Sequence, residues 1–183
     1  MFAAELSVRP EGSAGAQVAS RALDIVEIAA LRGQAAPLRT AAARFGMALP
    51  TFGQVAFEGE RTAICVRPDR WLLLTPTTGS GTLSPDWHAG LATAVELSCA
   101  LTAFHLTGAA TEDILVRGCR LDLDTKAFPV GHAAATIMAQ VSVVLARLAS
   151  GMLLLTPSTT AQHFHEWLLE AGRPFGLSGE RLS

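Results

Sequence analysis

Short runs of apolar residues, many of them β-prone, recur along this chain, a pattern typical of β-strands. Glycine and a Pro-Asp-Arg segment separate consecutive runs, and such residues favour the tight turns of antiparallel strand pairs. Strands are therefore predicted at residues 22–30, 52–58, 62–66, 71–74, 101–106, 134–140, 143–147 and 152–155.

Other segments place apolar residues three and four positions apart, which predicts amphipathic helices. One helix is predicted to begin near Pro37 and end at Gly46, and another is predicted at residues 109–117. The last is predicted at residues 161–171, with Thr160 as its N-cap. A further helix is predicted to begin with Ser84 as N-cap and Pro85 at its first position, and to carry Trp87, Leu91, Ala94 and Val95 on its apolar face.

The order of these elements repeats, and one segment repeats nearly letter for letter. Residues 71–77 read Trp-Leu-Leu-Leu-Thr-Pro-Thr, and residues 152–158 read Met-Leu-Leu-Leu-Thr-Pro-Ser. We therefore predict an α+β fold with mixed or antiparallel sheets, built as a single pseudo-duplicated domain over residues 21–183. Its two pseudo-symmetric β-α-β-β-β-α halves would span 21–97 and 98–175. Residues 1–20, rich in Gly, Ala and Ser towards their end, are predicted to form a flexible N-terminal arm.

The amino-acid composition indicates that this fold has more apolar surface than a protein working alone requires. Half of the residues are apolar, 16% are charged and the mean hydropathy is +0.35, whereas soluble domains average about 25% charged residues. A membrane span is not predicted, because Arg147 and Gly151 interrupt the most apolar stretch. The N-terminus resembles no signal peptide. We therefore expect a cytoplasmic protein whose apolar faces are covered by a partner.

Charge and cysteine content exclude two further classes. The net charge is −2 and Lys126 is the only lysine, so the sequence lacks the basic surface of a nucleic-acid-binding protein. The three cysteines form no Cys-x-x-Cys pair, so neither a zinc site nor a redox pair is predicted. We expect them to be buried as small apolar residues.

Candidate catalytic groups are few, and each has a structural interpretation. Residues 163–166 read His-Phe-His-Glu, but two histidines two positions apart point in different directions on a helix and do not share a metal. Glu112 and Asp113 fall in a first helical turn, where acids stabilise the helix dipole. Asp122 and Asp124 share one face of an extended segment, which fits a binding role or a solvated face equally well. No catalytic, cofactor-binding or metal-binding residue is predicted on this chain.

The second half carries more specific motifs. Residues 118–123 read Gly-Cys-Arg-Leu-Asp-Leu, residues 127–131 read Ala-Phe-Pro-Val-Gly, and residues 167–169 read Trp-Leu-Leu. In these motifs the chain resembles the gamma subunit of heterotetrameric sarcosine oxidase, clearly over residues 97–172 and less closely over 21–76. In the family, His-Pro often follows the Leu-Asp-Leu motif, where this chain has Asp124 and Thr125.

The resemblance implies a non-catalytic subunit of a complex that oxidatively demethylates sarcosine to glycine. It implies that FAD, FMN, NAD and tetrahydrofolate are bound by the larger subunits, and that this chain packs chiefly against the alpha subunit. It also implies a fold similar to the folate-binding domain of aminomethyltransferases. Three alternatives stay open. They are a free-standing folate-dependent aminomethyltransferase-like protein, a subunit of a related N-methyl amine dehydrogenase or oxidase, and an independent small-molecule-binding protein.

Three aromatic residues are candidates for the partner interface, since aromatic side chains dominate interface centres. Trp87 and Trp167 lie on predicted helices, and Phe128 lies in a rigid Phe-Pro-Val-Gly loop. Each fits core packing as well as contact with a larger subunit. For Phe128, packing into the core is slightly favoured.

Overall fold

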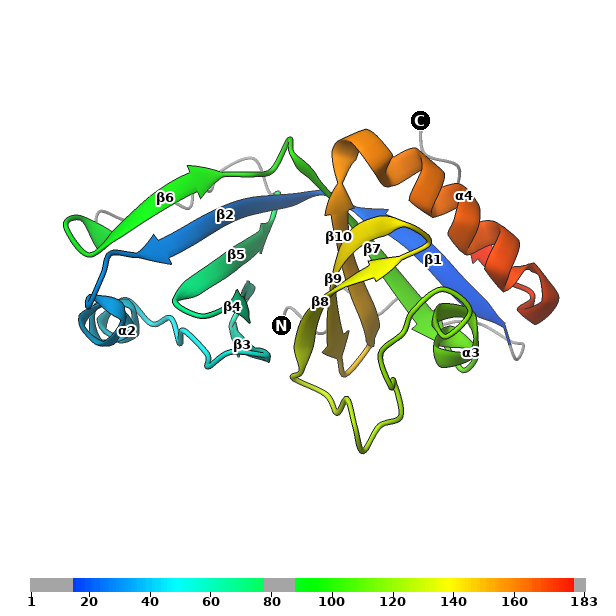
Figure 1. The fold of residues 1–183 in the computed structure, drawn as a ribbon, viewed down its shortest axis with the longest axis horizontal. Helices are drawn as coiled ribbons and strands as arrows, with labels where there is room; N and C mark the ends of the chain where they lie inside the picture. Colours follow the sequence, from blue (N-terminus) through cyan, green and yellow to red (C-terminus); the bar gives the residue numbers. More distant parts are fainter. Residues whose placement is uncertain (1–14, 78–87, 180–183) are drawn as a thin grey trace. The chain divides into compact units, whose positions relative to one another are not determined.

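The computed structural model describes residues 15–77 and 88–179, which fall into two compact units. The first unit contains residues 22–77 and 88–99, and the second contains residues 15–21 and 100–179. Each unit has its own sheet and its own helices (Figure 1). The sequence predicted a single domain over 21–183 with halves meeting at residues 97 and 98. The units divide close to that point, and residues 15–21 belong with the second.

The sheet of the first unit has five strands, all antiparallel, in the order β3-β4-β5-β2-β6. One helix, α2 (Ala35–Arg44), packs on it through Leu38 and Ala42. The strands are β2 (Leu23–Ala30), β3 (Gln54–Glu58), β4 (Arg61–Arg67), β5 (Arg70–Pro76) and β6 (Ala92–Glu96).

The core of this unit lies between α2 and one face of the sheet. Val26 and Ile28 of β2 and Leu73 of β5 meet the helix there, together with Trp71, which is fully buried. The indole Nε1 of Trp71 donates a hydrogen bond to the carbonyl of Pro50 at 2.8 Å. This bond fixes the loop between α2 and β3 to the sheet.

The sheet of the second unit has six strands in the order β11-β1-β7-β10-β9-β8 and is mixed, because β11 runs parallel to β1. Helices α3 (Thr111–Leu115) and α4 (Ala161–Gly172) contribute Ile114, Leu115, Phe164 and Leu168 to one core with this sheet. The strands are β1 (Ala16–Arg21), β7 (Leu101–Gly108), β8 (Ala133–Met138), β9 (Val141–Leu148), β10 (Gly151–Pro157) and β11 (Ser178–Gly179).

The duplicated plan is visible in the strand order. β3-β4-β5-β2 in the first sheet and β8-β9-β10-β7 in the second follow the same path along the chain. The two sheets also exchange strands, because β1 precedes β2 in sequence but pairs with β7, and β6 precedes β7 but pairs with β2. The α+β class with mixed and antiparallel sheets is thus confirmed.

Three sequence-based predictions are wrong. Cys99 is exposed, although all three cysteines were expected to be buried; Cys65 and Cys119 are buried. Residues 16–20 are not part of a flexible arm, because Ala16–Arg21 forms β1 and pairs with six residues of β7; residues 1–14 lie outside the described part. The predicted helix from Ser84 does not include Ala94 and Val95, which lie in strand β6. Spacing of three and four residues there matched a helix by chance, and pairing with β2 decided the local structure. Trp87 lies outside the described residues.

Candidate functional site

Arg147 on β9 is the most heavily engaged charged side chain of the second unit. It is 8% exposed and forms an ion pair with Glu112 of α3, with 2.6 Å between Nη1 and Oε1. Its Nη2 donates to the carbonyl of Leu123. One guanidinium therefore holds the first turn of α3 and the loop before β8 against the sheet, and its charge is compensated where it is buried.

A hollow of about 280 Å³ opens beside this ion pair, and Arg147 and Glu112 are its only charged lining residues. Gly108, Thr111 and Ser150 lie on its wall, but the Thr111 hydroxyl already donates to the Gly108 carbonyl at 2.8 Å. Small-ligand sites span about 300–1,000 Å³. The volume of the hollow lies just below this range, and its charged groups are directed at each other.

Two histidines are buried in the second unit. The Nε2 atom of His105, on β7, lies 3.2 Å from the Ser150 hydroxyl. Burial, together with the charge of Arg21, lowers the pKa of His105 to about 4. His165 on α4 stacks on Phe104 with ring centroids 5.5 Å apart, and its burial lowers its pKa. Both rings are therefore neutral near pH 7 and serve as packing groups.

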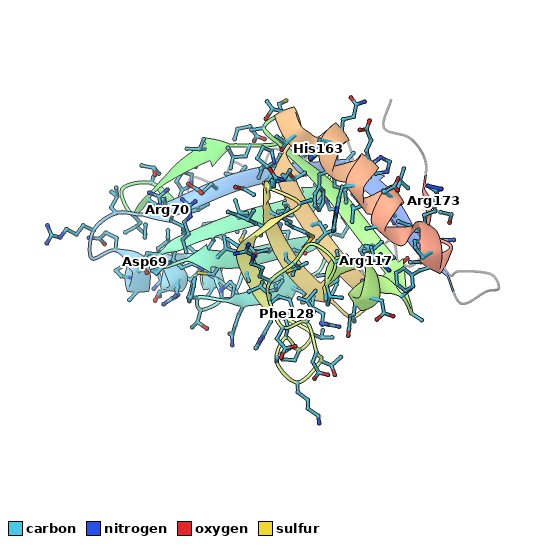
Figure 2. All side chains as sticks on the ribbon, turned by 45° about the vertical axis from the view of Figure 1, so that its right-hand side comes forward. Asp69, Arg70, Arg117, Phe128, His163 and Arg173 are labelled. Atoms are coloured by element: carbon cyan, nitrogen blue, oxygen red, sulfur yellow. The ribbon has the colours of Figure 1, made fainter. Side chains whose placement is uncertain are left out.

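The other candidate groups from the sequence have structural partners or face solvent. His163 is exposed (Figure 2). His165 is buried, so the two histidines lie on different faces of α4 as predicted. Asp122 and Asp124 accept backbone N–H bonds from Asp124 and Lys126 and thereby shape the loop before β8. In the described residues, no cluster of three or more His, Cys, Asp and Glu side chains is placed to hold a metal ion.

Phe128 and Trp167, the two aromatic candidates for partner contact among the described residues, lie in or against the core. Phe128 is 7% exposed, belongs to the core of the second unit and contacts His132 edge-on, with centroids 6.1 Å apart (Figure 2). Trp167 is partly buried and stacks on Phe164. The strongly exposed apolar side chains are instead ones that were not candidates for the interface, among them Phe45, Phe52, Phe57, Val95, Val116, Val130 and Ile137.

Sequence patterns only weakly indicate which apolar side chains are exposed. A single apolar residue in a strand or turn is usually assigned to the core, and only the known pairing shows which face or edge it occupies. Arg147 was noticed only as an interruption of an apolar stretch, because its partner Glu112 is 35 positions away. No helix in the described part of the chain combines the length and the apolar character that a membrane crossing requires.

Comparison with known proteins places this arrangement in a family. The family described as "Sarcosine oxidase, gamma subunit family" matches residues 32–173. A sarcosine oxidase subunit gamma from Arthrobacter sp. is 32% identical over 157 residues, which cover 82% of this chain and 76% of the relative.

Two solved structures share the fold. A chain of the heterotetrameric sarcosine oxidase from Corynebacterium sp. U-96, solved in complex with pyrrole 2-carboxylate, matches with a TM-score of 0.76 and 22% identity over 97% of this chain and 93% of its own. Aminomethyltransferase T of the glycine cleavage system from Bartonella henselae matches with a TM-score of 0.67 and 12% identity. That match covers 91% of this chain and 48% of the transferase. On the family match and the Arthrobacter relative together, this chain belongs to the sarcosine oxidase gamma subunit family.

Proposed function

We propose that this chain is a non-catalytic gamma-type subunit of a heterotetrameric sarcosine oxidase-like complex, in which it packs against a larger subunit, chiefly alpha. The complex would demethylate sarcosine oxidatively to glycine in the cytoplasm. The observation that carries this proposal is the family membership of the chain over residues 32–173. The match to a chain of a heterotetrameric oxidase over 97% of its length supports it.

The engagement of the polar side chains supports a role without catalysis on this chain. A catalytic acid or base has to reach a substrate from a cleft. Glu112 is paired with Arg147, and Asp122 and Asp124 bind backbone amides of their own loop. His105 is 2% exposed. The bonds of Glu112, Asp122 and Asp124 stabilise the second unit, and burial keeps His105 away from a substrate.

The cofactors are assigned to the partners. FAD, FMN, NAD and tetrahydrofolate would be bound by the larger subunits. In the hollow beside Arg147, the two charged lining residues are paired with each other, which supports this assignment. A free-standing folate-dependent transferase is the second candidate, favoured only by the fold it shares with aminomethyltransferase T. The match spans 48% of that protein.

Co-expression tests the proposal. The tagged full-length chain is produced alone and together with the larger subunits encoded by its host, and both preparations are assayed for sarcosine oxidation and flavin absorbance. We expect a flavin-containing complex that oxidises sarcosine, and a lone chain with neither property. Tetrahydrofolate titration of the lone chain by calorimetry should give no binding. Folate binding or turnover by the lone chain would favour the transferase and overturn the proposal, and so would failure to co-purify with any larger subunit.

A further inference from the structure

The outer edge of β8 has backbone groups that point away from the sheet. β8 pairs with β9 on one side, and within the described residues no strand pairs with its other side. Gly131 N–H donates to the Arg147 carbonyl and Arg147 N–H donates to the His132 carbonyl, each at 2.9 Å. Bonded and non-bonded pairs alternate along an antiparallel ladder. Counting from these bonds, the N–H and C=O groups of Ala133, Ala135 and Ile137 face outwards.

This edge lacks the features that normally prevent strand-to-strand association. Native edge strands carry charges, proline or a bulge. Residues 127–146, which include all of β8 and most of β9, contain no Asp, Glu, Lys or Arg, and β8 contains no proline. The pairing of β8 with β9 is continuous from Ala133 to Met138, and the bulge formed by Gly131, with φ of 87°, precedes the strand. Ile137 is 65% exposed.

The duplicated plan provides an internal comparison. β3 is the corresponding edge strand of the first unit, and it also ends in a two-residue hairpin turn. Counted back from the two turns, Val55 corresponds to Ala135 and Phe57 to Ile137. The β3 hairpin has Glu58, Glu60 and Arg61 at its turn, however. Of two equivalent edges, only the one in the second unit is free of charge.

We propose that the outer edge of β8 pairs, strand to strand, with an extended and uncharged segment of a larger subunit. The inference rests on the proposed function, and it identifies β8 as the element of this chain that docks on the larger subunit. Outward N–H and C=O groups at every second residue are complementary to an extended backbone. The uncharged stretch 127–146 is complementary to an uncharged segment, since charged residues are depleted at the centres of interfaces. An unlike subunit is preferred to a second copy because the solved relative is a heterotetramer.

Amide hydrogen exchange with single-residue resolution tests the pairing in the assembled complex. In the chain alone, the amides of Ala133, Ala135 and Ile137 should exchange quickly, while those of Ala134 and Thr136, bonded to β9, are already protected. Assembly should slow exchange at the three odd-numbered positions about tenfold or more. The corresponding amides of Val55 and Phe57 in β3 should not change.

Substitutions provide an independent readout. Ala135→Pro removes an outward N–H, which an edge strand tolerates, and Ile137→Lys adds a charge to the edge. Both should weaken capture of the larger subunits about tenfold or more, while the matched variants Val55→Pro and Phe57→Lys should not. Circular dichroism and thermal unfolding check that each variant folds, and Ile137→Lys decides the test should Ala135→Pro fail to fold.

The outcomes separate the two proposals. Assembly with protected odd-numbered amides, lost in Ile137→Lys, supports β8 as the docking element. Assembly without that protection overturns this inference and leaves the proposed function standing. Concentration-dependent self-association with the same protection means that a second copy occupies the edge and overturns the choice of partner. Failure of the wild-type chain to assemble with any larger subunit overturns both.

Discussion

The indole ring of Trp167 on α4 lies directly against Gly118, the last residue of the turn that follows α3. A Cβ atom at position 118 would overlap Cζ2 of that ring and come within 2.9 Å of Cη2. The ring also stacks on Phe164, with centroids 5.7 Å apart, so it has little freedom to withdraw. The Gly-Cys-Arg-Leu-Asp-Leu motif thus begins with glycine because the two helices of the second unit meet there.

Gly118→Ala should therefore destabilise the protein by about 1–3 kcal/mol, the usual cost of overpacking. The measurement is the free energy of unfolding in urea. Trp167→Leu supplies the matched background, because it removes the atoms that the new methyl group meets. We expect Gly118→Ala to cost markedly less in that background, giving a non-zero coupling energy. If the free-energy losses of Gly118→Ala and Trp167→Leu simply added up in the double variant, the contact between position 118 and the Trp167 ring would be contradicted.

Arg147→Met should destabilise the protein by about 2 kcal/mol, because it leaves the buried Leu123 carbonyl without its donor and removes the partner of Glu112. Glu112→Gln should cost less than about 1 kcal/mol, since the Glu112 side chain is 40% exposed and water screens the pair. Urea unfolding measures the loss of unfolding free energy in each variant and shows which loss is larger. An equal or larger loss for Glu112→Gln would mean that the ion pair, rather than the Leu123 bond, holds this region.

Much of the fold was predictable from the short runs of apolar residues, because buried strands leave a clear pattern in the sequence. The repeat of 71–77 in 152–158 correctly indicated equivalent strands, β5 and β10, at the same place in the two sheets. The exchange of β1 and β6 was not predictable. Local sequence determines that a segment is extended, whereas the choice between two similar sheets depends on pairing energies spread over many residues.

The candidate surfaces were less predictable than the fold. Phe128 and Trp167 were identified as large aromatic residues in suggestive positions, and both lie in or against the core of the second unit. The residues next to Ile137 do not distinguish it from a core residue in the sequence. Only the pairing of Ala133–Met138 with β9 shows that Ile137 lies in an edge strand. Whether a strand lies at the edge depends on the order of all the strands in the sheet, so a local sequence pattern does not predict it.

Trp71→Phe should destabilise the first unit by about 2 kcal/mol. The change removes the hydrogen bond to the Pro50 carbonyl and leaves a void at a side chain that is 0% exposed. Thermal unfolding followed by circular dichroism measures the loss. Phe45→Leu is the matched control, because Phe45 is 58% exposed and its replacement should change stability by less than about 0.5 kcal/mol. Equal losses for the two variants would show that Trp71 does not anchor this unit.

His105 should make the protein less stable in mild acid. Its pKa is about 4 in the folded chain and 6.5 for a free side chain. Between these values the unfolded chain binds more protons, so stability is complete above about pH 6.5 and falls as the pH drops towards 4, by up to about 3 kcal/mol. Unfolding free energies measured from pH 8 to pH 4 should show this slope in the wild type and a shallower one in His105→Phe. His165, whose pKa is also lowered by burial, should account for part of what remains. A slope unaffected by His105→Phe would place the acid sensitivity elsewhere.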